Sequence, residues 1–505
     1  MLKPAIVFTD HAVLQQGMPV PVFGWTDAET VTVSFAGHTV SSAAEDGRFL
    51  CSLPPMKAFE QGEMVIRTEN ESVCLQDILV GEVWLAGGQS NMEHPVFCSE
   101  YREEDLEENE NIRLFTVAHR PFPDADIWGW HFEGVRSLDS PWERATKQSI
   151  LHFSAVGYFF ARLLQKNLHV PVGVISCNWA GTTAEAWISE EHLKKNELAR
   201  REWDSWEKKL SELNLEEYEA YYRENQRQGL AYIKEIGDPV EWVRKNGKED
   251  FMYHVMFPFG WEIGPYHCCK PAGLRETMLE RVVPYGIRGV IWFQGCSNTR
   301  PEEDNEDWYT AVMHALEEDW REAFRQKELP FYTVQISTFE WDGKSLADDW
   351  CRIRDSQDRL CREDAHTYRV ISVDVGEKTN IHPFKKQPIG ERLALAALSE
   401  EYGIFQHWKS PVIQSAKRNG NTVELTFENV GHFRTMDREE PGQFFAFSGK
   451  QPTEIRAKPE GGRIILSLPE GKNFDAVGYA YCNYCRANVM NEYGMPRAPF
   501  KISLT

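Results

Sequence analysis

The sequence lacks the features that mark a membrane-inserted or exported chain. No run of about 18 apolar residues occurs along it, so we expect no membrane span. The first residues, MLKPAIVFTDHAVLQQ, contain no long apolar core and no small-residue cleavage site, so no secretory signal is expected there. The eleven cysteines are odd in number and scattered, unlike the dense framework of a small disulfide-rich scaffold. These absences predict a cytoplasmic protein.

A basic surface is also missing. The chain has 55 Lys and Arg against 77 Asp and Glu, which gives a formal net charge of −22. Phosphate binding needs a basic face, and no long Lys/Arg cluster occurs. We therefore expect no nucleic-acid partner and no membrane partner, and we interpret the acidity as a solubilising surface.

One motif has the form of a metal or redox site. Cys482-Asn483-Tyr484-Cys485 is a CxxC, but no second pair of Cys or His ligands at motif spacing lies near it in the sequence. It also sits in the strand-like stretch AVGYAYCNYCRANV, where cysteines behave as small hydrophobic residues. We therefore expect neither a metal nor a cofactor.

The apolar pattern changes twice along the 505 residues. Residues 1–76 alternate in the manner of short strands, which predicts an N-terminal β-rich module. Across 77–403, near-continuous apolar strands alternate with amphipathic helices, which is typical of a doubly wound parallel sheet covered on both faces. Residues 404–505 return to strand-like runs and predict a second β-rich module. The expected fold class is α/β, with all-β modules on both sides of the core.

A charged stretch interrupts the core at about 190–250. Its Trp, Tyr and Leu residues recur at helical spacing, which predicts an inserted helical hairpin. A coiled-coil partner site is the alternative interpretation, but the pattern lasts too few heptads for one.

Polar, glycine-marked loops follow four of the predicted strands. They contain Gly88-Gln89-Ser90-Asn91, Asn178 through Thr182, Gly295 through Asn298, and Gly376 through Pro383. In an open α/β sheet the loops after the carboxyl ends of the strands converge, and ligands bind there. We therefore expect these loops at one edge of one sheet.

Together the loops contain the groups that acyl transfer needs. A serine hydroxyl is a poor nucleophile unless a base removes its proton, which predicts Ser90 as nucleophile and His382 as base. The oxyanion of the tetrahedral intermediate needs N–H donors, which the backbones of Ser90 and Gly181 and the side chain of Asn298 can supply. The glycines before Ser90 are expected to allow a turn that exposes its hydroxyl. Each residue alone fits a turn or a helix cap equally well, so the prediction depends on the set.

Four segments are similar to one known family: GEVWLAGGQSNMEHPV, NWAGTTAEAW, GVIWFQGCSN and NIHPFKKQPIGERLALAAL. They resemble the sialate O-acetylesterase family, within the SGNH (GDSL-like) hydrolases. The resemblance extends to FTDHAVLQQGMPVPVFGW near the start and NVMNEYGMPRAPFK near the end. It implies an SGNH core and a serine esterase that removes acetyl groups from sugar hydroxyls without a metal or cofactor. It also implies the same four site residues: Ser90, Gly181, Asn298 and His382.

The sequence departs from the family pattern at three places. Cys296 stands where the family commonly has Glu, and Ala180 stands where it often has a first glycine. Thr379 occupies the position, three residues before the histidine, that usually carries the triad Asp. Among the nearby carboxylates we predict that Asp374, at a strand end, orients His382, with Glu377 or a Ser–His dyad as alternatives.

The predicted function is therefore a carbohydrate O-acetylesterase acting on sialic acid or on hemicellulose-type glycans. Trp84, Trp179 and Trp187 lie close to the motif loops and favour sugar stacking, although tryptophans at strand ends are also ordinary core residues. One competing hypothesis is a non-catalytic carbohydrate-binding protein on the same fold. Another is thiol chemistry at Cys296, which has no adjacent histidine in the sequence. The oligomeric state does not follow from the sequence.

Overall fold

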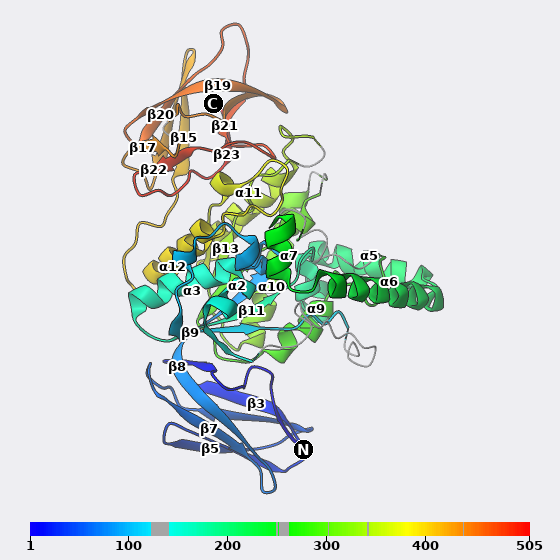
Figure 1. Cartoon of the computed structure of the whole chain (residues 1–505). Helices are drawn as coiled ribbons and strands as arrows, with labels where there is room; N and C mark the ends of the chain where they lie inside the picture. The colour runs from blue at the N-terminus through cyan, green and yellow to red at the C-terminus, as the bar shows by residue number, and fades with distance from the viewer. Residues whose placement is uncertain are drawn as a thin grey trace. The chain divides into compact units, whose positions relative to one another are not determined.

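The structure is a computed structural model that describes residues 1–122, 141–248, 251, 262–300, 302, 304–340, 343–437 and 439–504. Two compact units make up the chain (Figure 1). Unit 1 comprises Met1–Trp292 and Ala311–Phe331. Unit 2 comprises Phe293–Thr310 and Tyr332–Thr505. No helix among the described residues combines the length and apolar character that a membrane crossing would need.

Unit 1 begins with short antiparallel strands, drawn in blue in Figure 1. Their alternating buried and exposed side chains follow the two-residue period of a strand with one face in a core. Three of them form one sheet in the order β1-β3-β6, and β4 pairs with both β5 and β7 in another. The strands are β1 (Leu2–Pro4), β2 (Val13–Gln15), β3 (Val20–Thr26), β4 (Thr30–Phe35), β5 (His38–Ala43), β6 (Arg48–Leu53) and β7 (Gln61–Arg67).

The long strand β8 (Ser72–Gly88) connects these strands to the α/β part of unit 1 (Figure 1). Its first half pairs antiparallel with β7, and its second half pairs in parallel with β11 (Val172–Asn178). The second half is buried along its whole length, as expected for a central strand of a covered sheet. The strand therefore runs across the predicted boundary after residue 76, and the three-part division of the chain stays a prediction.

A parallel sheet forms around β8. In unit 1 the strand order is β10-β9-β11-β8-β12, with β9 parallel to β11, β11 parallel to β8, and β10 antiparallel at the edge. Helix α3 (Ala155–Leu168) packs against β9 and β11. The mixed α/β fold predicted from the alternation of strands and helices is thereby confirmed. The remaining elements are β9 (Asn109–Thr116), β10 (Glu143–Ala145), β12 (Gly289–Phe293), α1 (Ser90–Glu93), η1 (Val96–Cys98), η2 (Glu103–Asp105) and α2 (Lys147–His152).

A buried carboxylate stabilises the start of the central part of β8. Glu82 is 0% exposed, and its oxygens accept hydrogen bonds from Gln15 at 3.0 Å and from Arg288 at 3.0 Å. A buried carboxylate is tolerated only when it is paired in this way. Glu82 therefore joins three segments that are far apart in the sequence.

The described residues of the 190–250 stretch are largely helical and include α4, α5, α6 and α7, and the predicted helical hairpin stays a prediction. Three of these helices begin at a side-chain cap, supplied by Ser189, Asn196 and Asp238. On α5, Ala199 and Trp206 form the buried side of an otherwise charged helix. The elements named between residues 184 and 281 are η3 (Ala184–Trp187), α4 (Glu190–Lys195), α5 (Glu197–Glu212), α6 (Leu215–Ile236), α7 (Pro239–Asn246), α9 (Gly273–Thr277) and η4 (Leu279–Arg281).

Unit 2 is organised around the buried guanidinium of Arg354. Arg354 is 1% exposed and donates hydrogen bonds to four backbone carbonyls, those of Ile336, Ser337, Cys482 and Asn483. Helices α11 and α12 pack against β14. The elements are η5 (Cys296–Asn298), β13 (Phe331–Val334), α11 (Asp349–Glu363), β14 (Thr367–Val370), η6 (Val373–Val375) and α12 (Gln387–Glu400). Helix α10 (Asn305–Ala323) begins in unit 2, and most of it belongs to unit 1.

The C-terminal part of unit 2 consists of antiparallel strands. Seven of them form a sheet in the order β15-β16-β20-β19-β18-β21-β23, and β17 pairs with β22. Cys482 and Cys485 are both buried in the apolar core of this region. The strands are β15 (Val412–Asn419), β16 (Thr422–Glu428), β17 (Phe433–Thr435), β18 (Phe444–Ser448), β19 (Gln451–Glu460), β20 (Arg463–Ser467), β21 (Ala476–Tyr479), β22 (Val489–Asn491) and β23 (Phe500–Ser503).

Close packing at Gly81 predicts a stability effect. A Cβ there would lie 2.1 Å from the carbonyl oxygen of Pro171, which is backbone and cannot move aside easily. We expect Gly81→Ala to lower the free energy of unfolding by about 3 kcal/mol, measured by urea denaturation. Gly442→Ala is the control, because no atom lies within 4 Å of its added Cβ. Equal stability of the two variants would contradict the role given to Gly81.

Candidate active site

Ser90 lies directly beyond the end of β8, where the chain turns into the short helix α1. Gly88 has a φ of 132°, a conformation that favours glycine. Gly87 has another reason to be glycine, because an added Cβ would lie 2.9 Å from the ring of Trp292. The turn predicted before Ser90 therefore depends on Gly88, whereas Gly87 allows close packing. Ser90 itself is 3% exposed.

The loop that carries Gly181 begins beside the same strand end. Asn178, the last residue of β11, is in register with Gly88, and the N–H of Trp179 donates to the Gly88 carbonyl at 3.1 Å. Gly181 has a φ of 74°, so its own backbone conformation favours glycine. Unit 1 thus brings the predicted nucleophile and one predicted oxyanion donor to the same end of two adjacent parallel strands.

A buried carboxylate connects α1 to the Gly181 loop. An oxygen of Glu93 accepts the N–H of Ala180 at 2.5 Å, and the other lies 3.5 Å from Nε2 of His119. The His119 ring stacks on Trp179 at 4.2 Å between ring centroids. Because Glu93 is the last residue of α1, these contacts hold the helix of Ser90 against the loop of Gly181.

Asn298 lies in unit 2, at the end of the short helix η5. Its Oδ1 accepts a hydrogen bond from Nε2 of Gln294 at 2.6 Å, and the hydroxyl of Tyr309 donates to Oε1 of Gln294 at 2.9 Å. This chain of bonds sets the orientation of the Asn298 amide, because only its oxygen can accept from Gln294. The Nδ2 group is therefore the donor end of Asn298, as an oxyanion role requires.

His382 lies in a loop of unit 2 that hydrogen bonds hold along its backbone. The Asn380 side chain accepts from the N–H of His382 at 3.0 Å and donates to its carbonyl at 2.9 Å. Glu377 accepts from Nδ2 of Asn380 at 3.3 Å and from the N–H of Phe384 at 2.8 Å. The sequence reasoning missed Asn380, although its place two residues before the histidine is the pattern of an Asx turn.

The electrostatic environment of His382 favours the neutral imidazole. Burial and, as the smaller cause, the charge of Lys386 together lower the pKa of His382 from 6.5 to about 3. Lys386 is 0% exposed, and burial lowers its own pKa to about 7. A neutral imidazole is the form that accepts a proton, but its lowered proton affinity also makes it a weaker base.

Asp374 does not have the partner that was predicted for it. Its two carboxylate oxygens accept hydrogen bonds from Nη1 and Nη2 of Arg392, at 2.8 and 2.7 Å. Among the described residues of unit 2, no hydrogen bond joins Asp374 to His382. The prediction that Asp374 orients the imidazole is therefore corrected: a bidentate ion pair with Arg392 uses this carboxylate instead.

Two other Ser–His pairs occur among the described residues of unit 1, and in both the serine has a structural role. The Ser99 hydroxyl lies 3.1 Å from Nδ1 of His94 but donates to the carbonyl of Pro95, and Ser99 is 0% exposed. Ser189 lies 2.9 Å from Nδ1 of His192, and the largely exposed carboxylate of Glu322 lies 3.4 Å from Nε2. The Ser189 hydroxyl also accepts the backbone N–H of His192 at 3.4 Å, as the cap of α4.

Two of the three tryptophans near the motif loops do not form sugar platforms. Trp84 and Trp187 are both 0% exposed; Trp84 packs against Phe160, and Nε1 of Trp187 donates to Thr182 at 3.0 Å. They belong to the core of unit 1, which is the ordinary role of tryptophans at strand ends.

Comparisons with known proteins show which enzymes the chain resembles. A family model described as "Carbohydrate esterase, sialic acid-specific acetylesterase" matches residues 273–399. The sialate O-acetylesterase of Mus musculus is 25% identical over 473 residues, which are 86% of this chain and 80% of the mouse protein. The Homo sapiens sialate O-acetylesterase is 26% identical over 407 residues, which are 74% of this chain and 65% of the human protein. A carbohydrate acetylesterase structure from Xanthomonas citri matches with a TM-score of 0.76 and 26% identity, over 99% of both chains.

The chain is similar to sialate O-acetylesterases over most of its length. This confirms the resemblance seen in the four sequence segments, and the matches indicate that the chain is an ester hydrolase. These matches also argue against the competing hypothesis of a non-catalytic carbohydrate-binding protein on the same fold. The range that the family model matches contains Asn298, Asp374 and His382.

The ion pair between Asp374 and Arg392 predicts a structural effect. The two side chains are 5% and 9% exposed, and Arg392 also donates to the carbonyl of Ile371 at 2.8 Å. We expect Asp374→Asn to lower the free energy of unfolding by about 3 kcal/mol, because it leaves a buried guanidinium without its carboxylate. Urea denaturation measures this loss.

The kinetic constants of the same variant separate the two roles. We expect the folded Asp374→Asn protein to keep a kcat close to that of the wild type, because Asp374 makes no contact with His382. Asp374→Leu combined with Arg392→Met is the control, since removing both charges should restore part of the lost stability. A kcat reduced by orders of magnitude with unchanged stability would instead show that Asp374 orients the imidazole of His382.

Proposed function

We propose that the chain is a carbohydrate O-acetylesterase with an SGNH-type core, which hydrolyses acetyl esters on sugar hydroxyls through an acetyl-enzyme intermediate. The observation that carries the proposal is Ser90 at the turn after β8, with the loop of Gly181 beginning beside it in register. Similarity to a carbohydrate acetylesterase over 99% of the chain supports the same class of substrate. Sialic acid and hemicellulose-type glycans are the two proposed sources of the acetyl ester.

The proposed reaction has two steps. His382 removes the proton of the Ser90 hydroxyl, and Oγ attacks the acetyl carbonyl to form a tetrahedral oxyanion. The N–H groups of Ser90 and Gly181 and Nδ2 of Asn298 stabilise that oxyanion. The sugar hydroxyl leaves with the proton from His382, and a water molecule then hydrolyses the acetyl-enzyme by the same path to give acetate.

Each unit supplies support for its part of this mechanism. In unit 1, Glu93 holds α1 against the Gly181 loop by accepting the N–H of Ala180. In unit 2, Gln294 orients the amide of Asn298 as a donor. We propose that the Asn380 loop, rather than Asp374, positions His382, because Asn380 binds both backbone polar groups of the histidine. The cytoplasmic location expected from the sequence stays a prediction.

Acetate release from a panel of acetylated sugars tests the activity and its substrate class. The panel contains acetylated sialic acid, acetylated xylan and acetylated manno-oligosaccharides. We expect release from at least one of them, and the member with the highest kcat/KM identifies the substrate class. Absence of release from every member would contradict the proposed function.

The role of Ser90 predicts the effect of removing its hydroxyl. We expect Ser90→Ala to reduce kcat at least about a thousandfold, because no other group replaces the attacking oxygen. Ser99→Ala is the matched control: it removes another buried hydroxyl next to a histidine, and we expect it to retain turnover. Circular dichroism confirms that both variants fold. Loss of turnover in Ser99→Ala but not in Ser90→Ala would show that Ser99, and not Ser90, is the nucleophile.

The environment of His382 predicts a pH profile. Because burial and the charge of Lys386 lower its pKa from 6.5 to about 3, the base stays neutral in moderately acidic solution. We expect the acidic limb of kcat/KM to lie below pH 6.5 in the wild type, and Lys386→Met to move it toward higher pH. Burial is the larger cause, so it should keep the limb of the variant below 6.5 as well.

Lys385→Met is the control for this profile, because Lys385 is exposed and adjacent to Lys386 in sequence. The unfolded chain binds the His382 proton more readily than the folded chain, so the stability that this shift provides is lost as the pH falls from 6.5 toward 3. Circular dichroism at each pH therefore limits the profile to folded protein. An acidic limb at or above pH 6.5, or an equal shift in both lysine variants, would contradict the assignment.

A further inference from the structure

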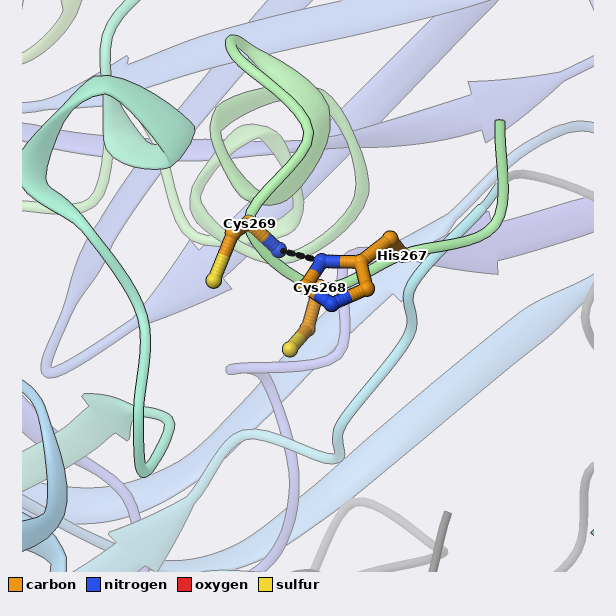
Figure 2. A group of neighbouring side chains, drawn as sticks. All are labelled: His267, Cys268 and Cys269. Carbon is orange, nitrogen blue, oxygen red and sulfur yellow. Dashed lines mark hydrogen bonds between the residues drawn. The ribbon is translucent and has the colours of Figure 1, made fainter. Parts of the chain in front are cut away.

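A cluster of one imidazole and two thiols lies in unit 1, outside the residues that the proposed reaction uses. It consists of His267, Cys268 and Cys269, in the segment between α7 and α9 (Figure 2). The ligand atoms of the three residues all lie within 4.8 Å of one another. Three donor atoms at this separation can reach a single metal ion.

Tight turns explain how three consecutive residues present their side chains to one point. The N–H of His267 donates to the carbonyl of Gly264 at 3.2 Å, and the N–H of Lys270 donates to the carbonyl of His267 at 2.9 Å. After these turns, the N–H of Ala272 donates to the backbone carbonyl of Glu185 at 2.9 Å. This bond attaches the segment to η3. The cluster therefore lies on anchored backbone.

One hydrogen bond holds the His267 ring in the cluster. The backbone N–H of Cys269 donates to Nδ1 of His267 at 2.9 Å, the dashed line in Figure 2. This bond occupies the Nδ1 lone pair and leaves the proton of the neutral ring on Nε2, so a metal that binds at Nδ1 must displace the Cys269 N–H. Figure 2 shows the side chains of both cysteines beside this ring.

The thiols are also chemically suited to a cation. Both cysteines are free and only partly buried, so a cation can reach their sulfur atoms. The thiolate is the form of cysteine that binds metals. The negative charge of Glu93 acts on Cys268, so it adds to the negative potential of the cluster.

We propose that His267, Cys268 and Cys269 form a binding site for a thiolate-seeking divalent cation, of which Zn²⁺ is the representative. Two sulfur ligands and one imidazole nitrogen match the donors that Zn²⁺ prefers, and three protein ligands leave a fourth tetrahedral position for water or an anion. Binding of the cation to both sulfurs as thiolates releases the two thiol protons to the solvent. Neither sulfur is oxidised or reduced in this step.

The site is connected to the loop of Gly181. The Cys269 thiol donates to the Gly181 carbonyl at 3.4 Å. A cation on this sulfur would replace that hydrogen bond, so occupancy should alter the loop that carries a predicted oxyanion donor. We therefore expect Zn²⁺ to inhibit acetate release. This part of the inference rests on the proposed function, whereas metal binding does not.

Metal titration of the full-length reduced protein tests the site. After removal of metals by a chelator, we expect one equivalent of Zn²⁺ to bind in competition with a chromophoric chelator. Cys268→Ser and Cys269→Ser should each weaken binding at least about tenfold, and the double variant should abolish it. Cys74→Ser is the control, because Cys74 is exposed and lies in the N-terminal strands. Co²⁺ in place of Zn²⁺ should give a sulfur-to-cobalt charge-transfer band that the double variant lacks.

The outcomes separate this site from the proposed function. Failure of the wild type to bind Zn²⁺, or binding that the double variant retains, would overturn the site. Isolation of a Cys268–Cys269 disulfide from protein that binds no Zn²⁺ would overturn it in favour of a redox pair. Inhibition by Zn²⁺ in the wild type but not in the double variant would support the connection to Gly181. If acetate release is absent altogether, the titration still measures the site.

Discussion

The backbone pairing of β8 is the constraint on which the rest of unit 1 depends. One continuous strand pairs with β7 in its first half and with β11 in its second half, and it ends directly before Ser90. A slip of one residue would place every side chain of the strand on the opposite face. It would also separate Gly88 from Asn178, and with them the two loops that begin there. The position of the predicted nucleophile is therefore a consequence of strand register.

Buried polar residues stabilise both ends of the central part of β8. Glu82 accepts hydrogen bonds from Gln15 and Arg288 at one end, and Glu93 accepts the N–H of Ala180 beyond the other. A buried carboxylate without partners would favour partial unfolding, so each one requires its neighbours to be in place. Because each buried carboxylate needs particular partners, these residues favour one arrangement of Ser90 and Gly181 over others. Apolar packing alone does not make that distinction.

The sequence predicted what depends on local pattern and missed what depends on contacts between distant residues. Periodicity identified the parallel strands and the helical stretch at 190–250, and the rule that loops converge at strand ends pointed to Ser90 and Gly181. Sequence periodicity could not show that Asp374 pairs with Arg392, because that ion pair joins two different elements, η6 and α12. It also missed the cluster at His267, since motif spacing looks for separated ligand pairs and not for three consecutive residues.

The loop of His382 illustrates how a base can be positioned without a carboxylate from the expected place. Asn380 forms hydrogen bonds with the backbone of His382 and not with its ring, so the loop fixes the position of the His382 backbone. Burial and Lys386 determine the protonation of the ring. A buried ammonium beside a base lowers the affinity of that base for a proton, which weakens proton abstraction but keeps the imidazole neutral. Because the pKa of Lys386 is lowered to about 7, this ammonium is itself partly deprotonated in neutral solution. The strength of the base is then coupled to the titration of a second buried group, so its proton affinity rises as Lys386 loses its charge.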